Sequence, residues 1–142
     1  MTDRTLTTAD YPLAENRPEL VKGQRGKALG EITLDAVLDG RVTLDDLKIT
    51  PRALRQQAEI ARDAGRSTLA ENFERASELV GVPGDEIMRF YELLRPGRAR
   101  SKHELLQAAR QLSETYGAHK MALYIEEAAV VYERRGLFNR RY

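Results

Sequence analysis

The side chains best suited to chemistry in this sequence are its histidines and a pair of adjacent glutamates. His103 follows an expected helix start at Ser101, and His119 begins the last expected helix. Neither has a second histidine three or four residues away, so the helical spacing of a zinc site is missing. Surface histidines are the simpler interpretation, and a site that both form through the tertiary fold stays open. Adjacent helical positions point about 100° apart, so Glu126 and Glu127 cannot share a substrate proton as a catalytic dyad would.

A glycine-rich segment and the arginines are the other features that could bind a ligand. Gly23, Gly26 and Lys27 superficially resemble a phosphate loop, but no Ser or Thr follows the lysine and no strand is expected before the segment. The chain has 18 arginines against five lysines. Guanidinium groups are well suited to protein interfaces and to binding phosphates. A base-composition bias that favours arginine over lysine is the alternative, and the arginines would then only contact solvent. With a net charge of +1, the signal for nucleic acid is weak, and the chain shows no catalytic signature.

Composition excludes several classes of protein. The 142 residues are 42% hydrophobic and 32% charged, and no apolar run approaches the ~20 residues of a membrane span. The absence of cysteine excludes disulfides, thiolate catalysis and cysteine-bound metals. The polar N-terminus lacks the apolar stretch of a signal peptide. We therefore expect a protein of the cytoplasm that does not act at a membrane.

The elements expected to position these side chains are helices. Residues 51–135 predict five helices, each closed by glycine or proline. Thr50 before Pro51 and Ser101 before Glu104 are helix-start signals. No stretch shows sustained strand-type alternation. We therefore predict an all-α fold, a compact bundle of about five helices with an extended N-terminal arm.

The first thirty residues differ from the rest of the chain. Apolar residues are sparse, two prolines interrupt the segment, and three glycines recur among basic residues. Such a segment cannot bury enough apolar surface to offset its own ordering entropy. It is either a disordered arm or an extended strap that docks on something else, with Tyr11, Pro12 and Leu13 as its anchor-like cluster. We assign residues 1–30 to this arm and residues 31–142 to the helical domain.

Aromatic residues at helical spacing are expected in the core. They are Phe73, Phe90, Tyr91, Tyr116, Tyr124 and Tyr132. Phe90 and Tyr91 are adjacent and precede a turn rich in arginine, so one of them could face outward as an interface anchor. The candidate interface residues outside the arm are therefore Tyr91, Arg95 and Pro96.

Short motifs in a fixed order run along most of the chain. They are DYPLA at residues 10–14, ITL at 32–34, ITP at 49–51, LRQQAEIARDAG at 54–65, LAENFERA at 69–76, LLRP at 93–96 and ELL at 104–106. Together they resemble the small (γ) subunit of adenosylcobalamin-dependent propanediol and glycerol (diol) dehydratases. None of these motifs is a chemical signature by itself, but their number and order argue against a chance match.

The resemblance implies one chain of an αβγ unit that pairs into a dimer of heterotrimers. The family's assembly is a lyase that dehydrates 1,2-propanediol or glycerol to the aldehyde by adenosyl-radical chemistry. In that family, the large (α) subunit holds the active site and the metal ion, and cobalamin lies between the large and medium (β) subunits. The resemblance therefore implies no catalytic, cofactor-binding or metal-binding residue on this chain. It implies a subunit that stabilises and assembles the large one, on which Tyr11, Pro12 and Leu13 would become ordered.

Location and alternative functions are further expectations. Some family members carry an N-terminal extension that directs the enzyme into a protein-shelled microcompartment. Only nine residues precede Asp10 here, so we expect no such extension, and any packaging would depend on another subunit. A stand-alone helical adaptor or a nucleic-acid-binding module is the alternative function, and nucleic-acid binding would fall steeply with salt. We expect neither nucleic acid nor a membrane as a partner.

Overall fold

The protein is all-α, as predicted. A computed structural model describes residues 4–138, and its regular elements are α-helices and short 3-10 turns. The described residues form no strand, although an isolated antiparallel bridge joins Lys22 and Ala28. The chain divides between Val80 and Gly81 into two compact units. The expected division into an arm of residues 1–30 and a helical domain stays a prediction.

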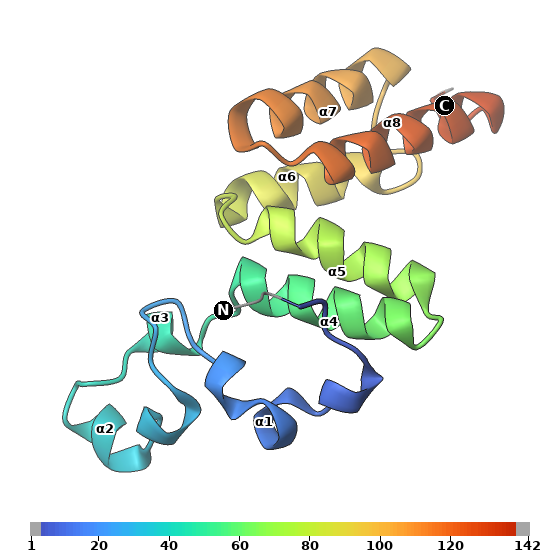
Figure 1. Ribbon diagram of the computed structural model, residues 1–142. Helices are drawn as coiled ribbons and strands as arrows, with labels where there is room; N and C mark the ends of the chain where they lie inside the picture. Colours follow the sequence, from blue (N-terminus) through green and yellow to red (C-terminus); the bar gives the residue numbers. More distant parts are fainter. Residues whose placement is uncertain (1–3, 139–142) are drawn as a thin grey trace. The chain divides into compact units, whose positions relative to one another are not determined.

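The N-terminal unit begins with short turns and ends with a pair of longer helices (Figure 1). Its elements are η1 (Thr8–Asp10), α1 (Leu13–Asn16), η2 (Pro18–Leu20), η3 (Leu29–Glu31), α2 (Leu34–Leu38), α3 (Leu44–Leu47), α4 (Pro51–Asp63) and α5 (Ser67–Leu79). Thr50 caps α4 by accepting a hydrogen bond from the Ala53 N–H at 3.0 Å. Gly65, with φ at +73°, permits the sharp turn between α4 and α5.

Helix α4 packs on two sides within this unit. One side carries small residues, Ala58 and Ala61, which are buried with Ala70 of α5. Such residues let two helix backbones approach closely. The other side presents Ile60 to Leu6 and Leu13 of the arm, and these three side chains form a second buried cluster. The arm therefore lies against α4 of its own chain.

The C-terminal unit contains the remaining three helices of the described chain. They are α6 (Gly84–Leu94), α7 (Lys102–Tyr116) and α8 (His119–Arg134). The hydroxyl of Ser101 accepts a hydrogen bond from the Glu104 N–H at 3.2 Å, as the capping signal predicts. The Glu104 carboxylate accepts from the Arg100 N–H at 2.8 Å, one residue earlier than a capping box requires. Gly117 ends α7 in the left-handed conformation, with φ at +65°.

Helices α7 and α8 pack against each other and carry most of the buried apolar residues of the C-terminal unit. The largest of those on α7 and α8, Leu105, Leu112 and Ile125, are almost completely shielded from solvent. The other buried residues on or beside these helices are alanines, namely Ala108, Ala109, Ala118, Ala122 and Ala129. Together with α4, α5 and α6, helices α7 and α8 confirm the five helices predicted between residues 51 and 135.

The expectation that all the aromatic residues are core residues is partly wrong. Phe90 is 4% exposed, but Tyr91 is 57% exposed and Tyr124 is 44% exposed. Helical periodicity places a side chain on a face without saying whether another element covers that face. The alternative that one residue of the Phe90–Tyr91 pair faces outward is confirmed.

Candidate functional site

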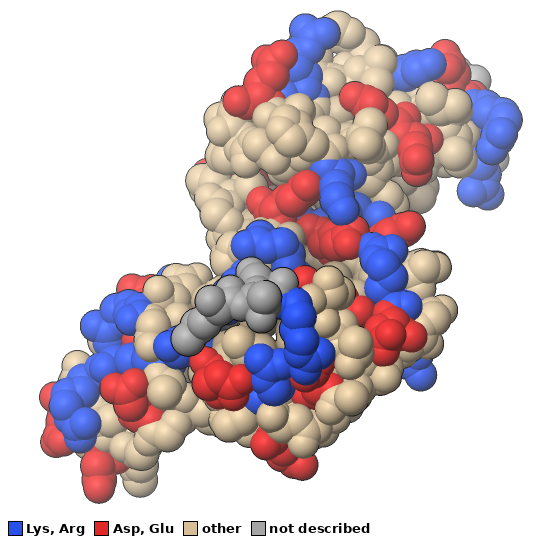
Figure 2. Space-filling view, viewed as in Figure 1, with Lys and Arg blue, Asp and Glu red and all other residues tan. Residues whose placement is uncertain are grey.

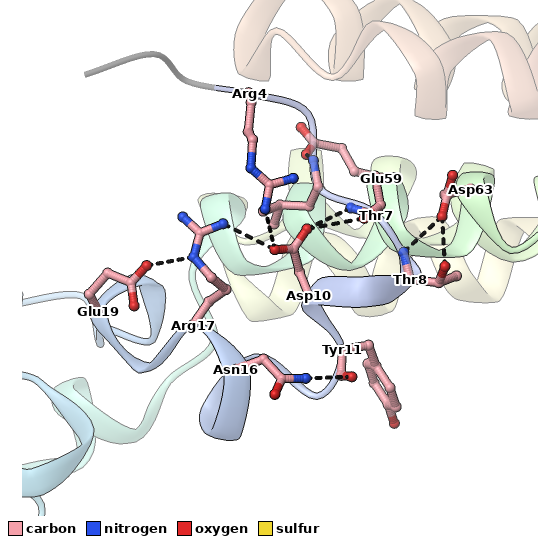
Figure 3. Close-up of polar contacts among 11 residues, drawn as sticks. Arg4, Thr7, Thr8, Asp10, Tyr11, Asn16, Arg17, Glu19, Glu59 and Asp63 are labelled. Carbon is pink, nitrogen blue, oxygen red and sulfur yellow. Dashed lines mark hydrogen bonds and ion pairs between the residues drawn. The ribbon is translucent and has the colours of Figure 1, made fainter.

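A buried carboxylate organises the N-terminal arm. The Asp10 side chain is only 5% exposed and accepts a hydrogen bond from the Thr7 N–H at 2.9 Å. It also forms ion pairs with Arg4 at 2.6 Å and with Arg17 at 3.1 Å (Figure 3). Arg17 pairs in addition with Glu19 at 2.6 Å. One aspartate thus fixes the turns on both sides of it.

These contacts keep the Asp10 carboxyl ionised. The hydrogen bond from the Thr7 backbone is the largest cause that lowers the pKa of Asp10 from 3.8 to about 2. Arg17 and Arg4 lower this pKa further, whereas burial acts in the opposite direction. The arm therefore folds around a fixed negative charge.

Two carboxylates of α4 hold the arm in place. The Glu59 carboxylate accepts a hydrogen bond from the Leu6 N–H at 2.7 Å. The Asp63 carboxylate accepts from the N–H and the hydroxyl of Thr8, at 2.8 Å and 2.9 Å. The Thr8 backbone contact is the largest cause that lowers the pKa of Asp63. Figure 3 shows both carboxylates reaching from α4 toward the arm.

A second buried aspartate joins distant segments of the N-terminal unit. The Asp46 side chain is fully buried and pairs with the Arg25 guanidinium, whose Nε donates at 2.8 Å. Asp46 also accepts from the Thr43 N–H at 2.9 Å, and Arg25 donates to the Arg41 carbonyl at 3.0 Å. The contact with Arg25 is the largest cause that lowers the pKa of Asp46 from 3.8 to about 2.

The glycine-rich segment is a hairpin that packs against α3. In the described chain no strand precedes it, so it is not a phosphate loop. The Gly23 N–H donates to the Lys27 carbonyl at 3.2 Å, and Gly26 turns the chain with φ at +79°. A Cβ atom on Gly23 would lie 2.5 Å from the carbonyl oxygen of Asp46. Only glycine therefore permits this approach. The hairpin also contacts the loop that follows α3, because the Gln24 amide donates a hydrogen bond to the Ile49 carbonyl at 3.2 Å.

An open groove of about 530 Å³ lies between these segments. Tyr11, Leu29, Leu47 and Ile49 line it, and they are 60%, 48%, 58% and 55% exposed. The groove also contains Ala53 and other residues of α4. Apolar side chains at this exposure are the feature of the N-terminal unit that best fits binding of a partner.

The groove brings together the arm residues that the sequence singles out. Tyr11 and Pro12 are exposed, and the Tyr11 ring points away from the polar contacts of the arm (Figure 3). Leu13 also lines the groove but is only 7% exposed, because it packs on Leu6 and Ile60. Tyr11 and Pro12 are thus accessible to a partner, whereas Leu13 anchors this segment to the buried cluster with Leu6 and Ile60. Their assignment to an interface stays a prediction.

The other three candidate interface residues lie at the end of α6. Tyr91 is exposed, and Arg95 and Pro96 are exposed in the turn that follows. Arg95 donates to the Glu92 carboxylate at 3.2 Å. These residues belong to the C-terminal unit and are not among the residues that line the groove, and their role stays a prediction.

Comparison with known proteins decides the family. The family model of the dehydratase small subunit matches residues 6–139. The chain belongs to this family. A propanediol dehydratase small subunit of Salmonella typhimurium is 48% identical over 134 residues, which are 94% of this chain and 77% of that relative. One of Citrobacter freundii is 49% identical over 131 residues, 92% of this chain and 76% of the relative.

Membership of the dehydratase small-subunit family confirms the resemblance carried by the sequence motifs. It does not favour the alternatives, a stand-alone adaptor or a nucleic-acid-binding module. Lys and Arg side chains alternate with Asp and Glu over the face shown in Figure 2, where a nucleic-acid site would need a continuous basic surface. None of the described helices is long and apolar enough to cross a membrane.

The histidines and glutamates considered for catalysis lie on the surface of this family member. His103 is exposed, and His119 is exposed with its Nδ1 2.7 Å from the Ser113 hydroxyl. Glu126 and Glu127 are both exposed on α8. Between residues 4 and 138, no group of three or more His, Asp or Glu side chains could hold a metal ion.

Sequence reasoning missed Leu29, Leu47 and Ile49 as groove residues. A usable signal existed for Leu47, because Thr43 and Asp46 have the spacing of a capping box. The helix α3 that follows Thr43 has four residues, too few to cover its own apolar side chains. The scarcity of lysine was a second signal. Three of the five lysines, Lys22, Lys27 and Lys48, line the same groove.

Proposed function

We propose that this chain is the non-catalytic small subunit of an adenosylcobalamin-dependent dehydratase that acts on 1,2-propanediol or glycerol. The identity of 48–49% to propanediol dehydratase small subunits, over more than nine-tenths of the chain, carries this proposal. The partners would be a large and a medium subunit, arranged as a dimer of heterotrimers. The chain would be one subunit of a lyase and contribute no catalytic residue.

The role proposed for the chain is to stabilise the large subunit. A protein that binds only the folded form of its partner shifts the partner's folding equilibrium toward that form. The exposed apolar side chains of the N-terminal unit support this role, since a surface of this kind is satisfied when a partner covers it. They include Tyr11, Leu29, Leu34, Leu38, Leu44, Leu47 and Ile49.

The cofactor would be bound by the other subunits. Imidazole is the commonest metal ligand among protein side chains. His103 and His119 lie on exposed helix surfaces, and neither lines the groove of the N-terminal unit. The proposal therefore assigns neither histidine to adenosylcobalamin. We place the complex in the cytoplasm, with a microcompartment as the alternative location.

Co-expression of the three subunits tests this function. We expect omission of the small subunit to lower the yield of soluble large subunit by about tenfold, because unprotected folding intermediates aggregate. The KM of the remaining enzyme for 1,2-propanediol or glycerol is expected to stay within about twofold, since the substrate site is on another chain. Normal assembly without the small subunit would contradict the proposal.

A further inference from the structure

The groove of the N-terminal unit combines apolar walls with free positive charge. Tyr11, Leu29 and Ile49 supply exposed apolar surface. Lys22 and Lys27 line the same groove, and neither forms an ion pair with any residue between 4 and 138. An occupant with apolar side chains and carboxylates would therefore complement both parts of this surface.

The acidic residues nearby do not neutralise this groove. The Asp46 side chain is fully buried and is paired with Arg25. Asp45 pairs with Lys48, the third lysine of the groove, at 2.8 Å. The charge of Lys27 also helps to lower the pKa of Asp46, but Lys27 forms no ion pair with that carboxylate. Lys22 and Lys27 therefore can still form ion pairs with a partner.

The walls of the groove are held in place before any partner binds. The ion pair of Arg25 with Asp46 ties the hairpin to α3, and the Gln24 amide ties it to Ile49. Gly23 brings the hairpin backbone directly against Asp46. A preformed surface loses less entropy on binding than a mobile one, so these internal contacts favour association.

We propose that this groove binds a segment of the large dehydratase subunit that carries apolar side chains flanked by Asp or Glu. The segment's apolar side chains would contact Tyr11, Leu29, Leu47 and Ile49, and its carboxylates would pair with the lysines. This inference rests on the proposed function, because it names where the partner subunit binds.

Charge argues against a second copy of the chain as the occupant. In a symmetric dimer the same patch meets itself, so the unpaired lysines of both copies would enter one interface without any added acidic side chain. Like charges placed opposite one another in an interface disfavour the complex. The large extent of exposed apolar wall likewise fits a protein segment better than a phosphate backbone.

Zero-length carbodiimide cross-linking of the assembled dehydratase tests the partner chemistry. This reagent joins a lysine to a carboxylate only where the two are in contact. We expect Lys22 and Lys27 to be linked to Asp or Glu of the large subunit. The Lys48–Asp45 pair of the same chain is the internal control, because its atoms are 2.8 Å apart. Links only to the medium subunit or to a second small subunit would overturn the inference, as would their absence when the control pair is linked.

Competition during assembly tests the same groove by mutation. Wild-type and variant small subunits are co-expressed with the other two chains, and mass spectrometry gives their ratio in complexes purified through a tagged large subunit. We expect Lys22→Glu with Lys27→Glu to be incorporated about tenfold less than wild type. Arg110→Glu, at an exposed position of α7, is the matched control and is expected within about twofold of wild type.

A second variant tests the apolar walls. Leu47→Ser with Ile49→Ser removes side chains that are more than half exposed, so the fold should be preserved. We expect this variant to be incorporated about tenfold less than wild type. Leu123→Ser on α8 is the control and is expected to be incorporated like wild type. If wild type itself fails to join the complex, the proposed function is wrong. If wild type and both groove variants join equally, only the groove is wrong.

Discussion

The two units of this protein are stabilised in different ways. The C-terminal unit packs α7 on α8 through Leu105, Leu112 and Ile125, all shielded from solvent. In the N-terminal unit, residues 4–50 bury few large side chains and are tied together by the ion pairs of Asp10 and Asp46. Residues 4–50 of the N-terminal unit therefore depend mainly on directional contacts between charges, whereas the C-terminal unit depends on close packing of apolar side chains.

This difference indicates which part of the chain needs a partner to cover its apolar side chains. A segment that folds around ion pairs keeps its apolar side chains free, and residues 29–49 expose Leu34, Leu38 and Leu44 to more than 70%. Exposed apolar surface of this kind is costly in water until it is covered. The N-terminal unit is thus arranged for association, while the C-terminal unit has a core of its own.

Leu112→Ala is expected to have the largest effect on stability. Its side chain is 0% exposed, and its removal should lower the free energy of unfolding by about 2–5 kcal/mol. Leu13→Ala is expected to fall at the low end, about 2 kcal/mol, because its surroundings border an open groove and can relax. Urea unfolding followed by circular dichroism measures both, with the exposed Leu123→Ala as control. An equal or larger loss for Leu13→Ala would contradict the contrast between the units.

Arg25→Ala is expected to loosen the N-terminal unit alone. It leaves the fully buried Asp46 carboxylate without its guanidinium, which disfavours the folded arrangement of the hairpin and α3. Hydrogen exchange of amides in residues 23–28 and 43–47 should become about tenfold faster, with α7 and α8 unchanged. Arg41→Ala is the matched control, because Arg41 pairs with Asp39 on the exposed surface. Similar exchange in the two variants would refute the proposed role of the ion pair.

Removing a helix cap should affect both units alike. Thr50 and Ser101 each accept one hydrogen bond from the third residue of the following helix, at 3.0 Å and 3.2 Å. We expect Thr50→Ala and Ser101→Ala each to lower the free energy of unfolding by about 1 kcal/mol. Urea unfolding measures this loss, and a difference of more than about twofold would show that a cap depends on its unit.

Acid should loosen the arm before the C-terminal core, with no effect near neutral pH. The pKa of Asp10 and that of Asp46 are lowered from 3.8 to about 2 in the folded chain. Their contribution to stability is therefore complete above pH 3.8 and is lost as the pH falls toward 2. Pepsin cleavage between pH 4 and pH 2 should begin in the N-terminal unit. Asp46→Asn is expected to weaken this pH dependence, because it removes one of the two titrating groups. Cleavage that begins within α7 would contradict the prediction.

The helix boundaries from residue 51 onward could be predicted because their signals are local. Thr50 and Ser101 start helices through bonds to residues three positions away, and Gly65 and Gly117 end them through their own conformation. Such rules act within one or two turns of chain, so a single sequence contains all that they require. The motifs were sufficient to identify the family because their order along the chain can be compared without knowing which segments meet in space.

The candidate site could be predicted only in part. Tyr11 and Pro12 stand out by type and are exposed beside the groove. Leu13 shares their motif, but its burial depends on Ile60, 47 positions away in the chain. The sequence predicted that one of Phe90 and Tyr91 could face outward, but it did not say which. The face of α6 that is covered depends on other helices, and the structure exposes Tyr91.

The sequence by itself determined the all-α class, the five longer helices and the dehydratase small-subunit family. Only the tertiary structure decided that Arg25 meets Asp46 and that Tyr11, Leu29 and Ile49 share one groove. The physical reason is range. Caps and periodicity are properties of adjacent residues, whereas an ion pair or a groove forms when separate segments close against one another and the gain in contacts offsets the entropy of closing the chain.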